Sequence, residues 1–104
     1  LYSKVSDVER AEERKQAEVD SFIALVRRNM ADIQEDKSAL LKEAGNHERA
    51  GRQVPAELLE QIALLEQRER GYLKEVERYQ QLKVDIAREF ILDKKRVEYL
   101  LQAR

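Results

Sequence analysis

Apolar residues in the first half of the chain recur every three or four positions, which is the spacing of one face of an α-helix. The series comprises Leu1, Val5, Val8, Val19, Phe22, Val26, Met30, Ile33, Leu40 and Ala44. Two successive steps of four, from Phe22 through Val26 to Met30, form a stutter, which locally unwinds a left-handed supercoil. The pattern predicts one continuous helix with an apolar seam.

Polar residues interrupt this seam between Val8 and Val19. Glu12 and Lys15 fall at the seam positions of this stretch, and a charged side chain loses hydration when it is buried against an apolar neighbour. We therefore expect this part of the helix to fray or to need a partner.

The next stretch holds two of the three glycines and the only proline of the chain. Gly45 or Gly51 can end the first helix in the left-handed conformation. Pro55 suits the first turn of the following helix, because its missing N–H would have no intrahelical partner there. Glu57 then lies at the end of the helix dipole that favours negative charge. We predict a connecting loop over about residues 46–54.

The second half carries its own apolar seam at the same spacing. Its members are Leu58, Ile62, Leu65, Tyr72, Val76, Tyr79, Ile86, Phe90, Val97 and Leu100. Gly71 falls inside this helix at a cost of about 1 kcal/mol relative to Ala, which so long a helix tolerates.

Two long helices joined by a short polar loop fold back on each other, since each has a seam to bury. The predicted fold is all-α: a long antiparallel two-helix coiled-coil hairpin in one domain, with helices at about 2–45 and 55–103. If Ala44 lies beside Leu58, facing residue numbers add up to about 102, which places Phe22 near Tyr79. Glu12 and Lys15 would then face Phe90 and Ile86. We interpret this mismatch as a shift of register, with a docked partner helix as the alternative.

The second helix has more apolar residues than one seam requires, which is typical of a helix with several neighbours. We predict a protein interface on its outer face, through which the hairpin forms a homodimer, such as a four-helix bundle, or a hetero-complex. The candidate interface residues are Leu59, Leu73, Leu82, Ile91, Leu92, Tyr99 and Leu101, with Val84 beside them.

Composition narrows the class of function. Charged residues make up 39% of the 104 residues, yet 20 basic and 21 acidic side chains are interspersed, whereas nucleic-acid binding usually needs a stripe of one sign. There is no Cys, no signal-like N-terminus and no apolar run long enough for a membrane span, so we expect a cytoplasmic protein with no membrane span and no nucleic-acid partner. The start at Leu1 rather than Met predicts an excised or processed segment.

The sequence lacks the residue patterns of the familiar catalytic, nucleotide-binding and metal sites. The only His, His47, lies in the predicted loop, and the three glycines match no phosphate-binding spacing. Carboxylate pairs such as Glu9 with Glu13 lack the Glu-x-x-His partners of a di-iron bundle and are interpreted as a solvated face. We expect no catalytic residues, no metal and no cofactor, and hence no enzyme.

Two charged clusters remain as binding candidates. The tip of the hairpin presents His47, Arg49 and Arg52, which could probe a partner or could simply be a soluble turn. The basic run from Lys94 to Arg96 lies near the turn that holds Glu12 and Glu13. We expect one of its members to pair with that turn rather than with phosphate or a membrane.

Residues 23–81 resemble the antiparallel coiled-coil modules that bind Rho-family GTPases. The resemblance is carried by the leucines of residues 38–42, the short polar connection, and the segments 58–62 and 75–79. The same segments are equally similar to stalk proteins of export systems and to ciliary coiled coils, so no single family is identified. The predicted function is a non-enzymatic scaffold or interaction module in a larger assembly. The resemblance implies the alternative, an effector that binds a small GTPase or a similar switch protein.

Overall fold

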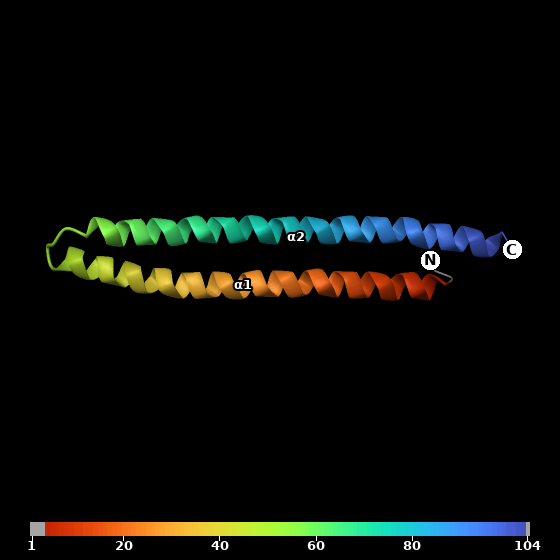
Figure 1. Ribbon diagram of the computed structural model, residues 1–104, viewed down its shortest axis with the longest axis horizontal. Coiled ribbons are helices and arrows are strands. Elements are labelled where there is room, and N and C mark those ends of the chain that lie inside the picture. The colour runs from red at the N-terminus through yellow and green to blue at the C-terminus, as the bar shows by residue number, and fades with distance from the viewer. Residues whose placement is uncertain (1–3, 104) are drawn as a thin grey trace. The chain divides into compact units, whose positions relative to one another are not determined.

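The computed structural model describes residues 4–103, and over these residues the chain consists of two helices and no strand. Helix α1 spans Val5–Arg49 and helix α2 spans Ala56–Gln102. Figure 1 shows that they run in opposite directions from the segment that connects them. The predicted helical hairpin is confirmed. The expected helix start at about residue 2 lies outside the described residues.

The contacts divide the hairpin into two compact units, each an antiparallel pair of helical segments. Unit 2 comprises residues 25–76 and contains the connection. Unit 1 comprises the described residues up to Ala24 together with those from Glu77 onward. Each unit has its own apolar core.

The core of unit 2 next to the connection is formed by Ala44, Leu58 and Ile62. Leu40 and Val54 pack against these three side chains. Ala44 therefore lies beside Leu58, as the predicted register requires. Val26 and Ile33 are also buried, each 7% exposed, and they continue this core along α1.

Helix α1 ends later than the sequence indicated, at Arg49 rather than at about residue 45. Gly45 is helical, and Gly51 is the residue that adopts a positive φ, of 71°. The Arg52 N–H donates to the His47 carbonyl (2.9 Å) and the Gly51 N–H donates to the Glu48 carbonyl (3.0 Å). These two bonds form a Schellman motif, which satisfies carbonyls at the end of the helix and fixes Gly51 as the terminating residue.

Helix α2 begins immediately after Pro55. The Pro55 carbonyl accepts hydrogen bonds from the N–H groups of Leu58 (3.1 Å) and Leu59 (3.2 Å). Glu57 lies in the first turn, as expected. The helix continues without interruption through Gly71, which is confirmed as a tolerated helical glycine.

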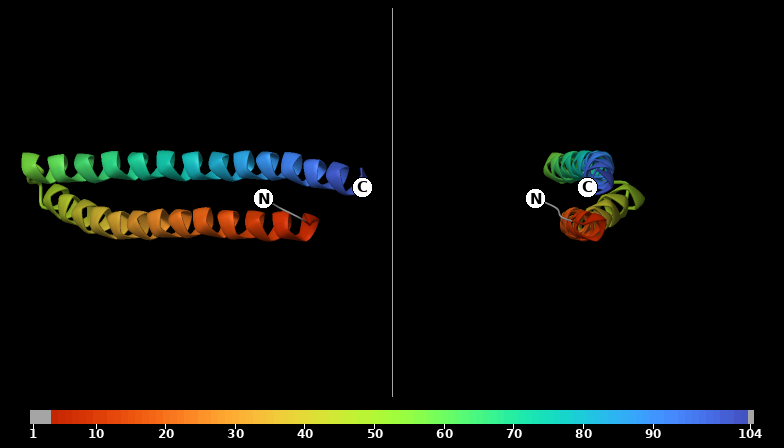
Figure 2. Two further views of the ribbon diagram at one scale, coloured as in Figure 1. Left: turned by 45° about the vertical axis from the view of Figure 1, so that its right-hand side comes forward. Right: turned by 90° about the vertical axis from the view of Figure 1, so that its right-hand side faces the viewer.

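The core of unit 1 contains Val8, Val19 and Ile23 on α1 and Ile86, Phe90 and Val97 on α2, all of them buried. Both views in Figure 2 show the helical segments of this unit lying side by side, in red and blue. The rings of Phe22 and Tyr79 stack with centroids 5.6 Å apart, which confirms their predicted proximity.

One correction to the predicted seam of α1 concerns Phe22. Ile23 is 7% exposed, whereas Phe22 is 43% exposed and covers the edge of the seam. When Ile23 rather than Phe22 is taken as the seam residue, the spacing between successive seam residues from Val19 to Ile33 alternates regularly between four and three positions. The predicted stutter at Phe22, Val26 and Met30 is therefore wrong.

The irregular step lies instead in the polar gap between Val8 and Val19. Glu12 and Gln16 are half-buried there, whereas Lys15 is exposed, so Gln16 and not Lys15 takes the second seam position. Two successive steps of four, from Val8 through Glu12 to Gln16, place the stutter here. The helix nevertheless runs through this stretch without a break, so the expected fraying is absent.

The hairpin predicts a short distance across unit 2 between two exposed positions, Arg28 and Lys74. Because the chain has no Cys, Arg28→Cys and Lys74→Cys would carry the only two spin labels. Packed helices lie roughly 8–10 Å apart, so we expect label separations of about 20–35 Å in double electron–electron resonance. If the chain formed one continuous helix instead of a hairpin, the two positions would lie about 70 Å apart, at 1.5 Å per residue. Dilution with unlabelled protein would remove any intermolecular signal.

Candidate protein interface

Helix α2 follows one heptad register along its length, with positions labelled a to g and the seam at a and d. Its seam residues are all buried or half-buried: Leu58, Ile62, Leu65, Glu69, Tyr72, Val76, Tyr79, Lys83, Ile86, Phe90, Asp93 and Val97. Leu100 is the next d position and is 57% exposed, and the residue that it would face lies outside the described residues. Helix α1 begins at Val5, and under the register Val5 faces Val97, so Leu100 lies beyond the described part of α1.

The surplus apolar residues of α2 occupy two sides of the helix rather than one outer face. The first flank, at positions e and b, comprises Leu59, Leu73, Val84, Ile91 and Leu101. The second flank, at positions g and c, comprises Leu64, Leu82, Leu92 and Tyr99. All nine are between 42% and 70% exposed. Leu64 was not among the predicted interface residues, although it is half exposed and shares its side of α2 with Leu82.

A polar ridge separates the two flanks and forms the side of α2 that is farthest from α1. It consists of the f positions Glu60, Gln67, Lys74, Gln81, Arg88, Lys95 and Gln102, and all seven are exposed. The two flanks therefore face different directions, and one flat partner surface would not cover both of them.

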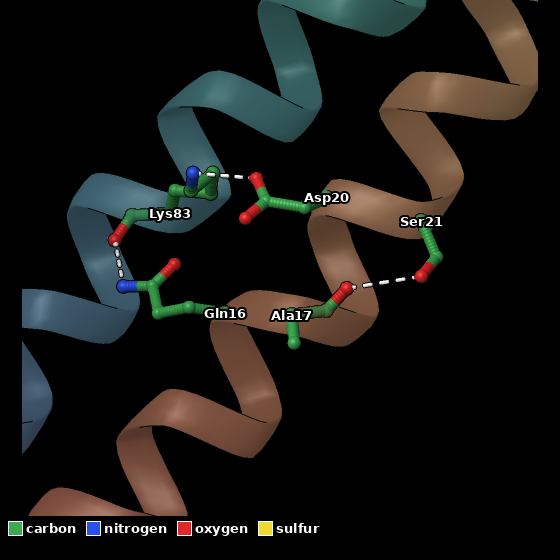
Figure 3. Close-up of polar contacts among 5 residues, drawn as sticks. All are labelled: Gln16, Ala17, Asp20, Ser21 and Lys83. Carbon is green, nitrogen blue, oxygen red and sulfur yellow. Dashed lines mark hydrogen bonds and ion pairs between the residues drawn. The ribbon is translucent and has the colours of Figure 1, made fainter.

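A polar layer lies between the helices of unit 1. The Gln16 Nε2 donates to the Lys83 carbonyl across the seam (3.0 Å), and the Lys83 ammonium donates to the Asp20 carboxylate. Figure 3 shows both contacts, together with the Ser21 hydroxyl that donates to the Ala17 carbonyl (3.1 Å). The Gln16 Oε1 is buried and finds no partner among the described residues. These polar residues take the place of apolar contacts between the helices, and their hydrogen bonds join α1 to one particular turn of α2.

Unit 2 has a corresponding polar contact inside its seam. The Lys37 Nζ lies 3.1 Å from the Glu69 Oε1, and the two side chains are 23% and 20% exposed. Both residues occupy seam positions, so this ion pair is partly shielded from water. We predict that this pair discriminates against other registers, because a shifted helix would bury each charge without its partner.

Lys94 pairs with Glu12 in unit 1, with 3.7 Å between Nζ and Oε1. This contact confirms the expectation that a member of the basic run pairs with the Glu12 turn. Arg96 lies 3.9 Å from Asp93 on its own helix. Two of the three basic residues therefore have carboxylate neighbours.

The three tip candidates take part in the cap of α1. The Arg52 Nε donates to the His47 Nδ1 (3.4 Å), and the Arg49 guanidinium donates to the Asn46 side-chain oxygen. The His47 carbonyl is also an acceptor in the Schellman motif. These contacts give each residue a local structural role, and binding of a partner at the tip stays a prediction.

Two apolar grooves lie between the helices, one in each unit and both on the side of the second flank. The groove of unit 2 has a volume of about 390 Å³ and is lined by Asp36, Ala39, Leu40, Gln61, Leu64 and Leu65. The groove of unit 1 has a volume of about 240 Å³ and is lined by Lys15, Glu18, Val19, Phe22, Leu82, Asp85, Ile86 and Glu89. Leu64 and Leu82 of the second flank are thus walls of grooves rather than isolated side chains.

Among residues 4–103, no three side chains of His, Asp or Glu gather into a potential metal site. Neither helix, within the same residues, combines the length and the apolar composition that a membrane span requires.

Comparisons with protein-family models, with curated proteins and with solved structures find no match for this chain.

Proposed function

We propose that this protein is a non-enzymatic interaction module that joins copies of itself, or a partner, through the first flank of α2 and so acts as a scaffold in a larger assembly. The observation that supports this proposal is the exposure of large apolar side chains on a folded hairpin. Leu73, Ile91 and Leu101 are 49%, 50% and 46% exposed after the two helices have packed. Association would remove this surface from water.

The energy available from burial of the first flank supports a weak interface. Full burial of a Leu or Ile side chain contributes about 1.5–3 kcal/mol, so the exposed half of each contributes about 1 kcal/mol. In a symmetric dimer each residue contributes twice, because the same patch is used on both subunits. Five residues on two copies then supply roughly 10 kcal/mol gross. Association costs about 4 kcal/mol or more in lost translational and rotational freedom, which leaves a dimer with a dissociation constant of about 40 μM or weaker. Pairing of two such hairpins would give the four-helix bundle expected from the sequence.

Replacing Leu73, Ile91 and Leu101 together with Gln tests the proposal. Gln has a helix propensity close to that of Leu, so the hairpin should keep its helical circular dichroism. We expect self-association, measured by sedimentation velocity over roughly 1–500 μM, to weaken by more than tenfold.

The second flank supplies the matched control. The triple variant Leu82→Gln, Leu92→Gln, Tyr99→Gln removes three comparable side chains of the same helix from the other side of the polar ridge. We expect its self-association to be unchanged. Equal losses in both variants, or a wild-type chain that stays monomeric throughout the range and captures no partner through this flank, would contradict the proposal.

The alternative function, binding of a switch protein, predicts that the binding affinity depends on the nucleotide state of that protein. A switch reader binds a Rho-type GTPase loaded with a non-hydrolysable GTP analogue more tightly than the GDP form, and the first-flank variant would retain this preference only if another surface carried it. Binding to the isolated GTPase in its two nucleotide states therefore separates the two functions.

A further inference from the structure

The groove of unit 1 combines an apolar floor with a charged rim. Val19 and Ile86 are 4% and 3% exposed and form its base, while Phe22 and Leu82, at 43% and 42%, form its walls. The Phe22 ring stacks on Tyr79, so this wall is held in place by a neighbouring side chain. Two residues from each helix thus surround a hollow of the kind that receives a side chain from a third helix.

The volume of this groove fits a side chain better than a free ligand. At about 240 Å³ it is smaller than the roughly 300–1,000 Å³ of typical small-molecule pockets. It is also open along the line between α1 and α2, so a helix can lie over it and insert successive apolar residues.

The rim carries an excess of negative charge. Glu18 on α1 and Asp85 and Glu89 on α2 surround the floor, and Lys15 is the only basic side chain of the lining. Three carboxylates and one ammonium group give a net charge of −2 within one groove. A cationic side chain next to the apolar floor would meet these carboxylates in the partly dehydrated setting where such contacts are strongest.

A second copy of the chain does not satisfy this rim in a two-fold arrangement. A symmetric contact would bring two copies of this patch, each with a net charge of −2, against each other. Like charges opposed across an interface disfavour association. The first flank, which supports the proposed self-association, lies on the other side of the polar ridge and remains usable when this groove is filled.

We propose that the groove of unit 1 binds an amphipathic α-helix from another protein, with an apolar stripe over Phe22 and Leu82 and Lys or Arg on both sides of that stripe. This inference shares with the proposed function only the general class, protein binding, and it concerns a different surface. The occupant follows from the shape of the floor and the sign of the rim.

The test uses designed peptides with the intact chain. The first probe is a three-heptad peptide with Leu at positions a and d and Lys at e and g, and the second has Glu in place of every Lys. Fluorescence anisotropy of the labelled peptides gives the two dissociation constants. We expect the Lys peptide to bind at least tenfold more tightly than the Glu peptide, with an affinity that falls as salt is raised.

Two pairs of variants decide whether the contact is in this groove. Glu18→Lys with Glu89→Lys should weaken the Lys peptide by about tenfold or more and strengthen the Glu peptide, since each exposed pair is worth up to about fivefold and becomes repulsive. Glu35→Lys with Glu60→Lys changes the net charge equally at exposed positions outside the groove and should leave both affinities nearly unchanged. Leu82→Gln should weaken binding about tenfold, whereas Leu73→Gln on the first flank should not.

Equal effects of the two charge-reversal pairs would overturn the inference, because they would show attraction to overall charge rather than to the groove. Equal affinity for the two peptides, or no binding of either, would overturn it as well. None of these outcomes depends on self-association through the first flank, which sedimentation of the Leu73, Ile91 and Leu101 variant reports separately. Circular dichroism of every variant shows that the hairpin is still folded.

Discussion

Replacing Ile86 by Asp is expected to lower the free energy of unfolding by about 3–5 kcal/mol. Ile86 is 3% exposed in the core of unit 1. The substitution removes its packing and places a carboxylate where few polar partners are available. Chemical denaturation followed by circular dichroism at 222 nm measures the loss. A change of this size would shift a thermal midpoint by more than about 12 °C in a chain of this length.

Ile91→Asp is the matched control for Ile86→Asp. It makes the same chemical change five residues further along the same helix, at a side chain that is 50% exposed. In the monomeric chain a carboxylate there keeps its hydration, so we expect a loss of no more than about 1 kcal/mol when unfolding is measured below the concentration of self-association. In unit 2, Ile62→Asp and Leu59→Asp form an equivalent pair, at 7% and 53% exposure. Similar midpoints within either pair would show that the assigned seam is wrong.

The seam and the hairpin were predictable because the relevant signals are local. The alternation of three and four residues specifies a helical face, and Gly51 and Pro55 mark where one helix stops and the next starts. The register also followed from the sequence, since aligning Ala44 with Leu58 placed Phe22 at Tyr79. Each of these inferences depends on spacing along the chain and on the short connection.

The exact seam membership of α1 was not predictable in the same way. Phe22 and Ile23 are adjacent and both apolar, and spacing from Val19 permits either. The seam also contains polar residues, Gln16 and Lys37, and the heptad register that passes through them selects Ile23 rather than Phe22. A search for apolar spacing does not find polar seam residues. The helix end shows the same limit, because Gly45 and Gly51 are equivalent in sequence until one of them adopts a positive φ.

The candidate interface was only partly predictable from the sequence. The surplus of apolar residues on α2 was evident, but their division into two flanks requires the seam to be fixed first, and the polar ridge then separates them. The groove of unit 1 draws residues from two segments that lie 60 positions apart in the chain, Phe22 and Leu82 being the nearest members. Its charged rim therefore appears only once Glu18 is placed opposite Asp85 and Glu89.

Removing one member of the Lys37–Glu69 pair is expected to destabilise unit 2 by about 1–3 kcal/mol, whichever member is removed. The two side chains are 23% and 20% exposed and lie at seam positions, so Lys37→Leu leaves the Glu69 carboxylate half-buried without its ammonium partner. Residual contact with water keeps the loss below that of a fully buried pair. The same argument applies to Glu69→Leu. Guanidinium denaturation of each variant measures the effect.

The double variant Lys37→Leu, Glu69→Leu should recover this stability and exceed that of the original chain by about 1 kcal/mol, because two leucines replace a pair that had to be dehydrated. It should also lose specificity. With an uninterrupted apolar seam, the helices tolerate other registers and partners, so sedimentation should detect additional oligomers. The free energy of unfolding would then rise while the chain lost its single register and oligomeric state. This combination is expected of a residue pair that selects the register.

The exposed pair of Arg10 and Asp7 provides the reference for this double-mutant cycle. Its side chains are 66% and 33% exposed and lie one turn apart on α1. We expect a coupling energy of at most about 0.5 kcal/mol for this pair, against 1 kcal/mol or more for Lys37 with Glu69. A coupling energy near zero for the seam pair, together with an unchanged oligomeric state of the double variant, would mean that the apolar layers alone determine the register. The alignment of Ala44 with Leu58 would then depend on the short connection and on packing.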